Sequence, residues 1–150
     1  ISLASLGKLS NRQGVIDDNK EITVAEDLRH KLRIKTPTIF QKIGHLSGGN
    51  QQKAILARWI YADPDVLILD EPTRGIDVGA KYEIYGIINE LVALGKAVIL
   101  ISSEMPEVLG MSDRIYVMRQ GALVKEMPSA DATQEKIMHH ASGVKGSEAQ

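Results

Sequence analysis

The sequence has no cysteine among its 150 residues, and only 4% of its residues are aromatic. Without cysteine, the chain can form neither a disulfide framework nor a thiolate metal site. Its longest apolar runs, Val66–Leu69 and Ala97–Ile101, fall far short of the roughly 20 residues that a membrane-spanning helix needs. The formal net charge is −1, so the composition gives no reason to expect broad binding to nucleic acid or to anionic lipid.

One basic cluster is present, near the end of a helix predicted over residues 21–35. The cluster has no interleaved aromatic side chains on which bases could stack, so a solvated helix face is the better interpretation and no nucleic-acid partner is expected. Its members are Arg29, His30, Lys31, Arg33 and Lys35.

Beyond these absences, the composition is that of a globular protein, with 43% hydrophobic and 25% charged residues. The length suits a single domain with its own core. The chain opens on Ile1 rather than Met, and its first residues already read as structured. We therefore expect the sequence to begin partway through a domain.

The first third of the chain reads as mainly helical, and the rest alternates between strand and helix. Strands are predicted at Val66–Leu69 and Ala97–Ile101, each apolar on both faces as in a buried parallel sheet. A helix is predicted over 77–94, with one apolar stripe formed by Ile84, Ile87, Ile88, Leu91 and Leu94. A hairpin is predicted around residues 119–121 and a last helix over 133–140. The alternation predicts an α/β layered fold, which binds ligands at the carboxyl ends of its strands.

The first motif that carries chemistry is the segment from Leu46 to Gln51, which opens a predicted helix. Gly48 and Gly49 let the backbone approach a ligand closely, and Ser47 offers a hydroxyl group. The free N–H groups at a helix N-terminus favour an anion such as phosphate. Taken alone, the segment is better interpreted as a Ser-Gly-Gly turn that merely starts a helix.

The second motif is the strand Val66–Leu69 followed by Asp70 and Glu71. Asp70 could hold a hydrated Mg²⁺, which prefers oxygen ligands and keeps several waters. Glu71 could orient or deprotonate an attacking water. The alternative is a strand that ends in the N-cap of a helix.

Together the two motifs resemble the nucleotide-binding domain of ATP-binding-cassette (ABC) transporters. Leu46–Gln51 looks like the family's signature loop, Val66–Glu71 like its Walker B strand with the following glutamate, and Gly75–Asp77 like its D-loop. The resemblance implies a P-loop NTPase fold, here a helical signature subdomain plus part of a parallel-sheet core. It also implies ATP and Mg²⁺ as cofactors and an ATPase activity in the complete protein.

Further residues resemble the monosaccharide-importer branch of the family, whose cargo is ribose-, xylose- or galactose-like sugar. They are Asn50 in place of the usual glutamine, the segment 73–81 and the segment 102–107. The resemblance implies a peripheral position on the cytoplasmic face of the bacterial inner membrane. The implied partners are a sugar permease, a first nucleotide-binding domain of the same subunit and, indirectly, a periplasmic sugar-binding protein.

In this family two domains pair head to tail and sandwich ATP. The resemblance therefore places Ser47, Gly48 and Gly49 on the ATP held by the opposite domain, with Asp77 crossing the same interface. Asn50 and Gln51 complete the expected nucleotide-binding set. Asp70 is the expected Mg²⁺ residue, acting through water, and Glu71 is the expected catalytic carboxylate.

The sequence departs from the family pattern because it lacks any Gly-x-x-x-x-Gly-Lys-Ser/Thr phosphate loop, the Walker A segment. We therefore expect the chain to be the C-terminal part of a larger protein, within its second nucleotide-binding domain, and not competent by itself. The expected organisation is a partial helical subdomain over 1–62, part of the ATPase core over 63–141 and a flexible tail over 142–150.

A second departure is Ser103, which stands where the family usually has a histidine that contacts the γ-phosphate. Serine can form a hydrogen bond but cannot carry the charge or the proton of an imidazole. We therefore expect the site that contains Glu71 to hydrolyse ATP poorly.

Two alternatives come from other functional classes. One is a non-transport ABC ATPase acting in translation or repair, against which the absence of a coiled-coil segment argues. The other is an interaction fragment without activity as an isolated chain.

Overall fold

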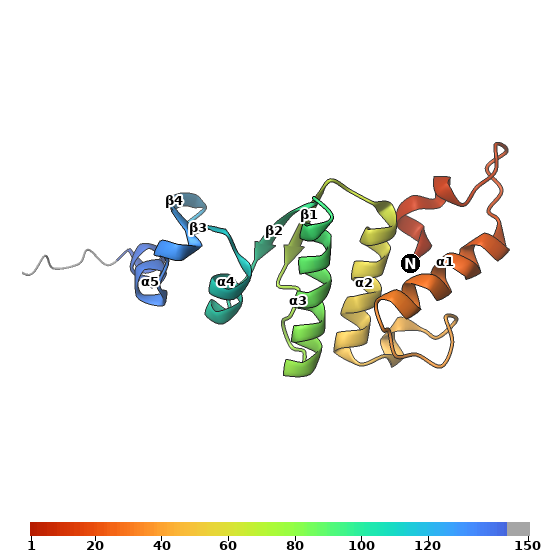
Figure 1. The fold of residues 1–150 in the computed structure, drawn as a ribbon, viewed down its shortest axis with the longest axis horizontal. Helices are drawn as coiled ribbons and strands as arrows, with labels where there is room; N and C mark the ends of the chain where they lie inside the picture. The colour runs from red at the N-terminus through yellow and green to blue at the C-terminus, as the bar shows by residue number, and fades with distance from the viewer. Residues whose placement is uncertain (144–150) are drawn as a thin grey trace, which may run out of the picture. The chain divides into compact units, whose positions relative to one another are not determined.

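The computed structural model describes residues 1–143, which divide into two compact units, one spanning Ile1–Ile99 and the other starting at Leu100. In the first unit, two short 3-10 helices accompany three α-helices and a strand (Figure 1). In chain order these elements are η1 (Ser2–Lys8), α1 (Asp18–Lys31), η2 (Ile43–His45), α2 (Gly48–Ala62), β1 (Val66–Asp70) and α3 (Val78–Ala93). Strand β2 (Ala97–Ile101) follows and pairs with β1. The α/β class is thereby confirmed.

Helix α1 ends earlier than the pattern over 21–35 predicts. Arg33 adopts a left-handed conformation with φ of 51°, and the Ile34 N–H donates back to the Arg29 carbonyl. This is a Schellman ending, in which a left-handed residue closes the last turn. Ile34 is buried just beyond it. Burying Ile34 redirects the chain before Lys35, so the predicted helix end was wrong.

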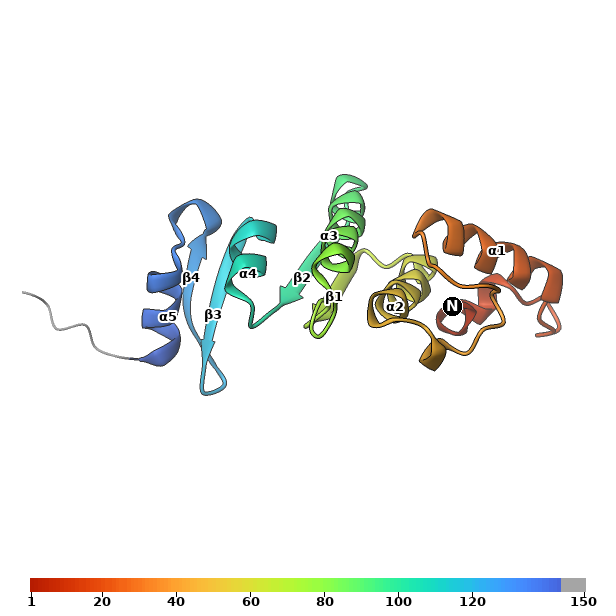
Figure 2. The same cartoon turned by 90° about the horizontal axis from the view of Figure 1, so that it is seen from below.

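Helices α2 and α3 lie side by side in both views of the first unit (Figures 1 and 2). The apolar stripe predicted on α3 is largely confirmed, because Ile84, Ile87 and Ile88 are buried. Leu94 is the exception, since its side chain is 69% exposed. It caps the helix where Gly95 turns the chain with φ of 85°, so it no longer follows the buried face.

The two predicted strands of this unit are confirmed, but their burial on both faces is not. Leu67 and Leu69 of β1 are buried, whereas Val66 and Ile68 are more than half exposed. Ile99 of β2 is also half exposed. Successive side chains of a strand point to opposite faces, so only one face of this sheet is covered within the described residues.

The second unit is built on a hairpin backed by a helix. Strands β3 (Arg114–Arg119) and β4 (Ala122–Pro128) pair antiparallel, which confirms the predicted hairpin (Figure 2). Helix α4 (Met105–Met111) precedes them, and η3 (Ser129–Asp131) and α5 (Gln134–Ser142) follow. One apolar core joins the hairpin to α5 through Ile115, Val117, Met127 and Ile137.

The remaining predictions concern the end of the chain, membrane-spanning helices and the boundary between subdomains. Helix α5 ends at Ser142, and the flexible tail predicted over 142–150 lies from residue 144 onward outside the described residues, so it stays a prediction. No helix within residues 1–143 is long and apolar enough to cross a lipid bilayer. The subdomain boundary predicted at residues 62 and 63 stays a prediction.

Candidate functional site

The predicted signature loop forms the N-terminus of α2. Ser47 is the N-cap, in an extended conformation, and its side chain makes no capping hydrogen bond to the backbone. Gly48 and Gly49 form the first turn. The N–H groups of a first turn have no acceptor inside the helix. This turn therefore presents backbone donors and the positive end of the helix dipole, which together suit an anion.

Asn50 and Gln51 are both held by the loop itself. The Asn50 Nδ2 group donates to Ser47 Oγ at 2.8 Å, and Asn50 Oδ1 accepts from the Lys35 N–H at 2.8 Å. Gln51 Nε2 donates to the Leu46 carbonyl at 2.8 Å. Both amide side chains thus fix the conformation of the loop, in addition to whatever contact they make with a ligand.

The two glycines lie against the segment that resembles the D-loop. A Cβ atom on Gly48 would come within 3.3 Å of the Ile76 side chain, and one on Gly49 within 2.5 Å of the Ala80 Cβ. Asp77 is the N-cap of α3, where its Oδ1 accepts from the Ala80 N–H at 2.9 Å. The N-termini of α2 and α3 are therefore packed directly against each other.

An ion pair between a buried lysine and an exposed glutamate ties the same two helices together one turn further on. The Lys53 ammonium, with a side chain only 3% exposed, lies 2.6 Å from Glu83 Oε2 and donates to the Arg33 carbonyl at 2.8 Å. The hydrogen bond from Lys53 holds the pKa of the Glu83 carboxyl below its usual value. The pair links α2, α3 and the end of α1 at one point.

Asp70 and Glu71 stand at the carboxyl end of β1, as predicted. Asp70 is exposed, and its carboxylate oxygens are the donors that Mg²⁺ prefers. Glu71 has a left-handed backbone with φ of 47°, and its carbonyl accepts from the Arg74 N–H in the turn that follows. Thr73 is buried in this turn. The left-handed conformation turns the chain sharply between the strand and the D-loop segment.

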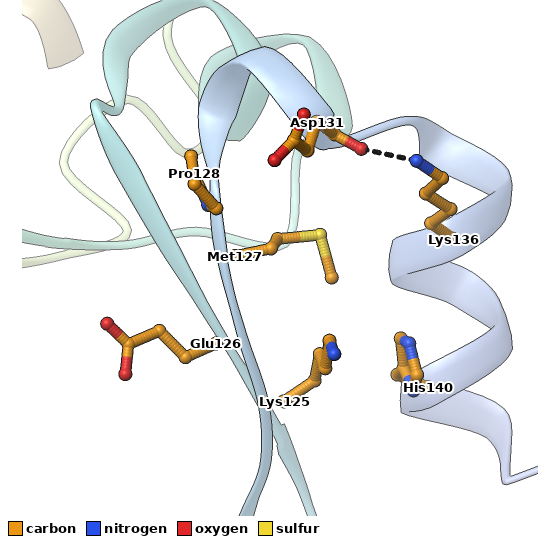
Figure 3. Close-up of a pocket in the computed structure, with 7 residues that line it drawn as sticks. All are labelled: Lys125, Glu126, Met127, Pro128, Asp131, Lys136 and His140. Carbon is orange, nitrogen blue, oxygen red and sulfur yellow. Dashed lines mark hydrogen bonds between the residues drawn. The ribbon is translucent and has the colours of Figure 1, made fainter.

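The remaining predicted site residue, Ser103, follows β2 and belongs to the second unit, where it is exposed. That unit has a surface cavity of its own (Figure 3). The Lys136 ammonium donates to the Asp131 carbonyl at 2.7 Å across its edge, and none of the predicted site residues lines it. The lining residues are Lys125, Glu126, Met127, Pro128, Asp131, Lys136 and His140.

Sequence reasoning located the loop residues but missed Lys53 and Glu83. A lysine within a helix that is otherwise half apolar is by itself only weak evidence for an ion pair. Its partner lies 30 residues away, and only the packing of α2 on α3 shows that the two charges meet.

The ABC transporter family matches the chain over residues 5–74. This range includes the Ser47 loop, the strand β1 and Glu71. The chain belongs to the ABC transporter family.

Several curated relatives share more than half of their aligned residues with this chain. It is 59% identical over 138 residues to the L-arabinose transport ATP-binding protein AraG of Geobacillus stearothermophilus, covering 92% of this chain and 27% of that protein. It is 57% identical over 141 residues to the ribose import ATP-binding protein RbsA of Clostridium tetani, covering 94% and 28%. The chain thus spans about a quarter of the length of these relatives.

Solved structures support the fold at lower sequence identity. A dimeric bacterial ABC transporter cassette superposes with a TM-score of 0.67 at 21% identity, covering 77% of this chain and 50% of that one. An ABC transporter of metal-chelate type, in an inward-facing conformation, superposes with a TM-score of 0.75 at 15% identity, covering 94% and 55%. These likenesses establish the P-loop NTPase fold of the cassette.

Proposed function

We propose that this chain is part of the ATP-hydrolysing subunit of an ABC importer for monosaccharides. It supplies the signature loop, the Walker B strand and the D-loop, which couple ATP binding and hydrolysis to sugar uptake. The observation that carries the proposal is the N-terminus of α2, where Ser47 makes no capping bond and Gly48 and Gly49 open the helix. The relatives named as arabinose transport and ribose import ATP-binding proteins support the sugar class.

In this proposal the α2 N-terminus acts on a nucleotide held by another nucleotide-binding domain. The Ser47 hydroxyl and the N–H groups of Gly48 and Gly49 donate hydrogen bonds to its terminal phosphate. Hydrogen bonds to a charged acceptor are about twice as strong as those between neutral groups. Asp77 stands at the same interface, because the packing of Gly48 and Gly49 on α3 brings the D-loop beside the signature loop.

The site formed by Asp70 and Glu71 serves the nucleotide bound within the same domain. Asp70 would hold Mg²⁺ through water, and the ion would neutralise phosphate charge. Glu71 is a half-buried carboxylate that can accept a proton from an attacking water. Ser103 stands where the family usually has a histidine, so this site hydrolyses ATP less well than its partner site.

The partners that follow from the proposal are a first nucleotide-binding domain of the same subunit, a sugar permease and, indirectly, a periplasmic sugar-binding protein. The place of action is the cytoplasmic face of the bacterial inner membrane. The 150-residue chain contains no Walker A sequence. By itself it therefore neither binds ATP tightly nor hydrolyses it.

The test compares Ser47→Arg with Glu71→Gln in the full-length protein assembled with its permease. We expect Ser47→Arg to abolish sugar transport and most ATPase activity, because it fills the competent site with a bulky side chain. Glu71→Gln should do less harm, since Ser103 already weakens its site. The control is Asn89→Arg, which adds the same side chain at an exposed position of α3.

Either of two results would contradict the proposal. If Ser47→Arg kept normal transport, the signature role of this loop would be wrong. If Glu71→Gln proved the more damaging substitution, the assignment of a weak site to Glu71 and Ser103 would be wrong.

A further inference from the structure

The side-chain oxygen of Ser47 has an unusual partner for an N-cap residue. A serine in this position ordinarily accepts a hydrogen bond from a backbone N–H two or three residues later. Here its Oγ accepts instead from the Asn50 side-chain amide at 2.8 Å, and it caps no backbone group. Asn50, the third residue of α2, thus donates its side-chain hydrogen bond back to the Ser47 hydroxyl.

The orientation of the Asn50 amide is fixed by its second partner. Asn50 Oδ1 lies 2.8 Å from the Lys35 backbone nitrogen, which can only donate. The carbonyl oxygen of the amide must therefore face Lys35, and its NH₂ group must face Ser47. This removes the ambiguity between oxygen and nitrogen that an asparagine side chain otherwise has.

The direction of this bond decides what the Ser47 hydroxyl can do. A hydroxyl group has one proton to donate and two lone pairs to accept with. The amide N–H of Asn50 occupies a lone pair, so the hydroxyl proton cannot point at Asn50 and is directed elsewhere. The hydroxyl proton is therefore available to another acceptor, as are the backbone N–H groups of the first turn, which have no acceptor within the helix.

We propose that Asn50 is a positioning residue that holds the Ser47 hydroxyl as a hydrogen-bond donor toward the terminal phosphate of a nucleoside triphosphate. This inference rests on the proposed function and gives Asn50 a role that differs from direct contact with the nucleotide. Asn50 acts through Ser47. Its bond to Lys35 keeps the amide in the one orientation in which Ser47 must donate outward.

A simpler role for Asn50 would be purely structural. In that case it would only tether the segment around Lys35 to α2. The two roles differ in which atom of Asn50 matters, because the tether needs Oδ1 and the positioning role needs the NH₂ group.

The test is a double-mutant cycle in the full-length protein assembled with its permease, with the ATP dependence of hydrolysis as the readout. The variants are Ser47→Ala, Asn50→Ala and the two combined. Each single substitution should lower kcat/KM for ATP by about tenfold, the loss of one hydrogen bond to a charged group. The combined variant should be no worse than Ser47→Ala, because Asn50 has no hydroxyl left to position.

Asn50→Asp tests the oxygen and the NH₂ group of the Asn50 amide separately. The aspartate keeps an oxygen for the Lys35 N–H but has no N–H to donate to Ser47. We expect the melting temperature to stay within a few degrees of the wild-type value while kcat/KM for ATP falls at least tenfold. Gln52→Ala is the matched control, since it removes a neighbouring amide from the same helix.

The outcomes distinguish this inference from the proposed function. If Ser47→Ala leaves kcat/KM unchanged, the signature role of the loop fails and the role of Asn50 fails with it. If Ser47→Ala is impaired but the losses multiply to about a hundredfold in the combined variant, only the role of Asn50 is overturned. Wild-type activity of Asn50→Asp would likewise leave Asn50 as a tether and overturn the positioning role.

Discussion

Gly49 and Ala80 are in direct contact where the first turns of α2 and α3 meet. A Cβ atom built on Gly49 would lie 2.5 Å from the Ala80 Cβ, a separation that real side chains do not adopt. Gly49 is buried at this point. Gly49 therefore serves the packing of α2 on α3.

Gly49→Ala should destabilise the protein by about 1–3 kcal/mol, because two methyl groups would have to share the space of one. Adding Ala80→Gly should restore most of the loss by removing the opposing methyl group. The measurement is chemical unfolding of both variants. Gly86→Ala is the control, since nothing lies within 4 Å of that position in α3. A Gly49→Ala variant as stable as wild type would contradict this contact.

The Lys53–Glu83 ion pair predicts a loss of stability in acid. The pKa of Glu83 is lowered by its hydrogen bond from Lys53, so the folded state holds the proton less tightly than the unfolded chain. The stabilisation is present above the pKa of the unfolded chain and disappears as the pH falls through the lowered pKa of the folded state. Glu83→Gln should flatten the fall in unfolding free energy over this range.

The matched control for this substitution is Glu90→Gln, at an exposed carboxylate further along α3. It should leave the acid dependence close to that of the wild type. An unfolding free energy for Glu83→Gln that falls with acid as steeply as for the native protein would show that the pair is not responsible.

The backbone of Glu71 predicts an unusual preference for glycine. A residue with a Cβ atom pays roughly 1 kcal/mol to adopt a left-handed conformation, which Gly adopts freely. With φ of 47° at Glu71, Glu71→Gly should be more stable than Glu71→Ala by about 1 kcal/mol. Both variants lose the carboxylate, so the comparison isolates the backbone. Thermal melting measures the difference, and a more stable alanine variant would rule out the strained turn.

The hairpin of the second unit predicts a glycine requirement at its tip. Gln120 and Gly121 have φ of 50° and 79°, the pattern of a type I′ turn, which needs positive φ at both central residues. Gly121→Ala should cost about 1 kcal/mol, and Gln120→Asn should be neutral or slightly stabilising. Gly110→Ala in α4 is the control, since nothing lies within 4 Å of it. Unfolding followed by circular dichroism tests both expectations.

Much of the local structure could be predicted because its causes are local. The apolar stripe of Ile84, Ile87 and Ile88 defined α3, and the glycine at 121 defined the hairpin turn. The proposed site residues at the carboxyl end of β1 and at the start of α2 were predicted from short motifs, since the chemistry of phosphate and Mg²⁺ binding needs particular residues at fixed spacing.

Most of the errors arise from contacts that the sequence does not encode locally. The end of α1 moved because Ile34 is buried, and Leu94 left the apolar stripe because the helix had already ended at Ala93. The exposure of Val66 and Ile68 depends on which elements cover the two faces of the sheet. The apolar run shows only that both faces of the strand are suited to burial.

The sequence by itself determined the family, the motifs and the order of helices and strands, because periodicity and turn chemistry act over a few residues. Only the tertiary structure decided how those motifs are held. Lys35 fixes the Asn50 amide from 15 residues away, and Glu83 meets Lys53 across 30 residues. Such pairings depend on how helices pack, so the donor and acceptor roles within the Leu46–Gln51 loop emerge only when α1, α2 and α3 come together.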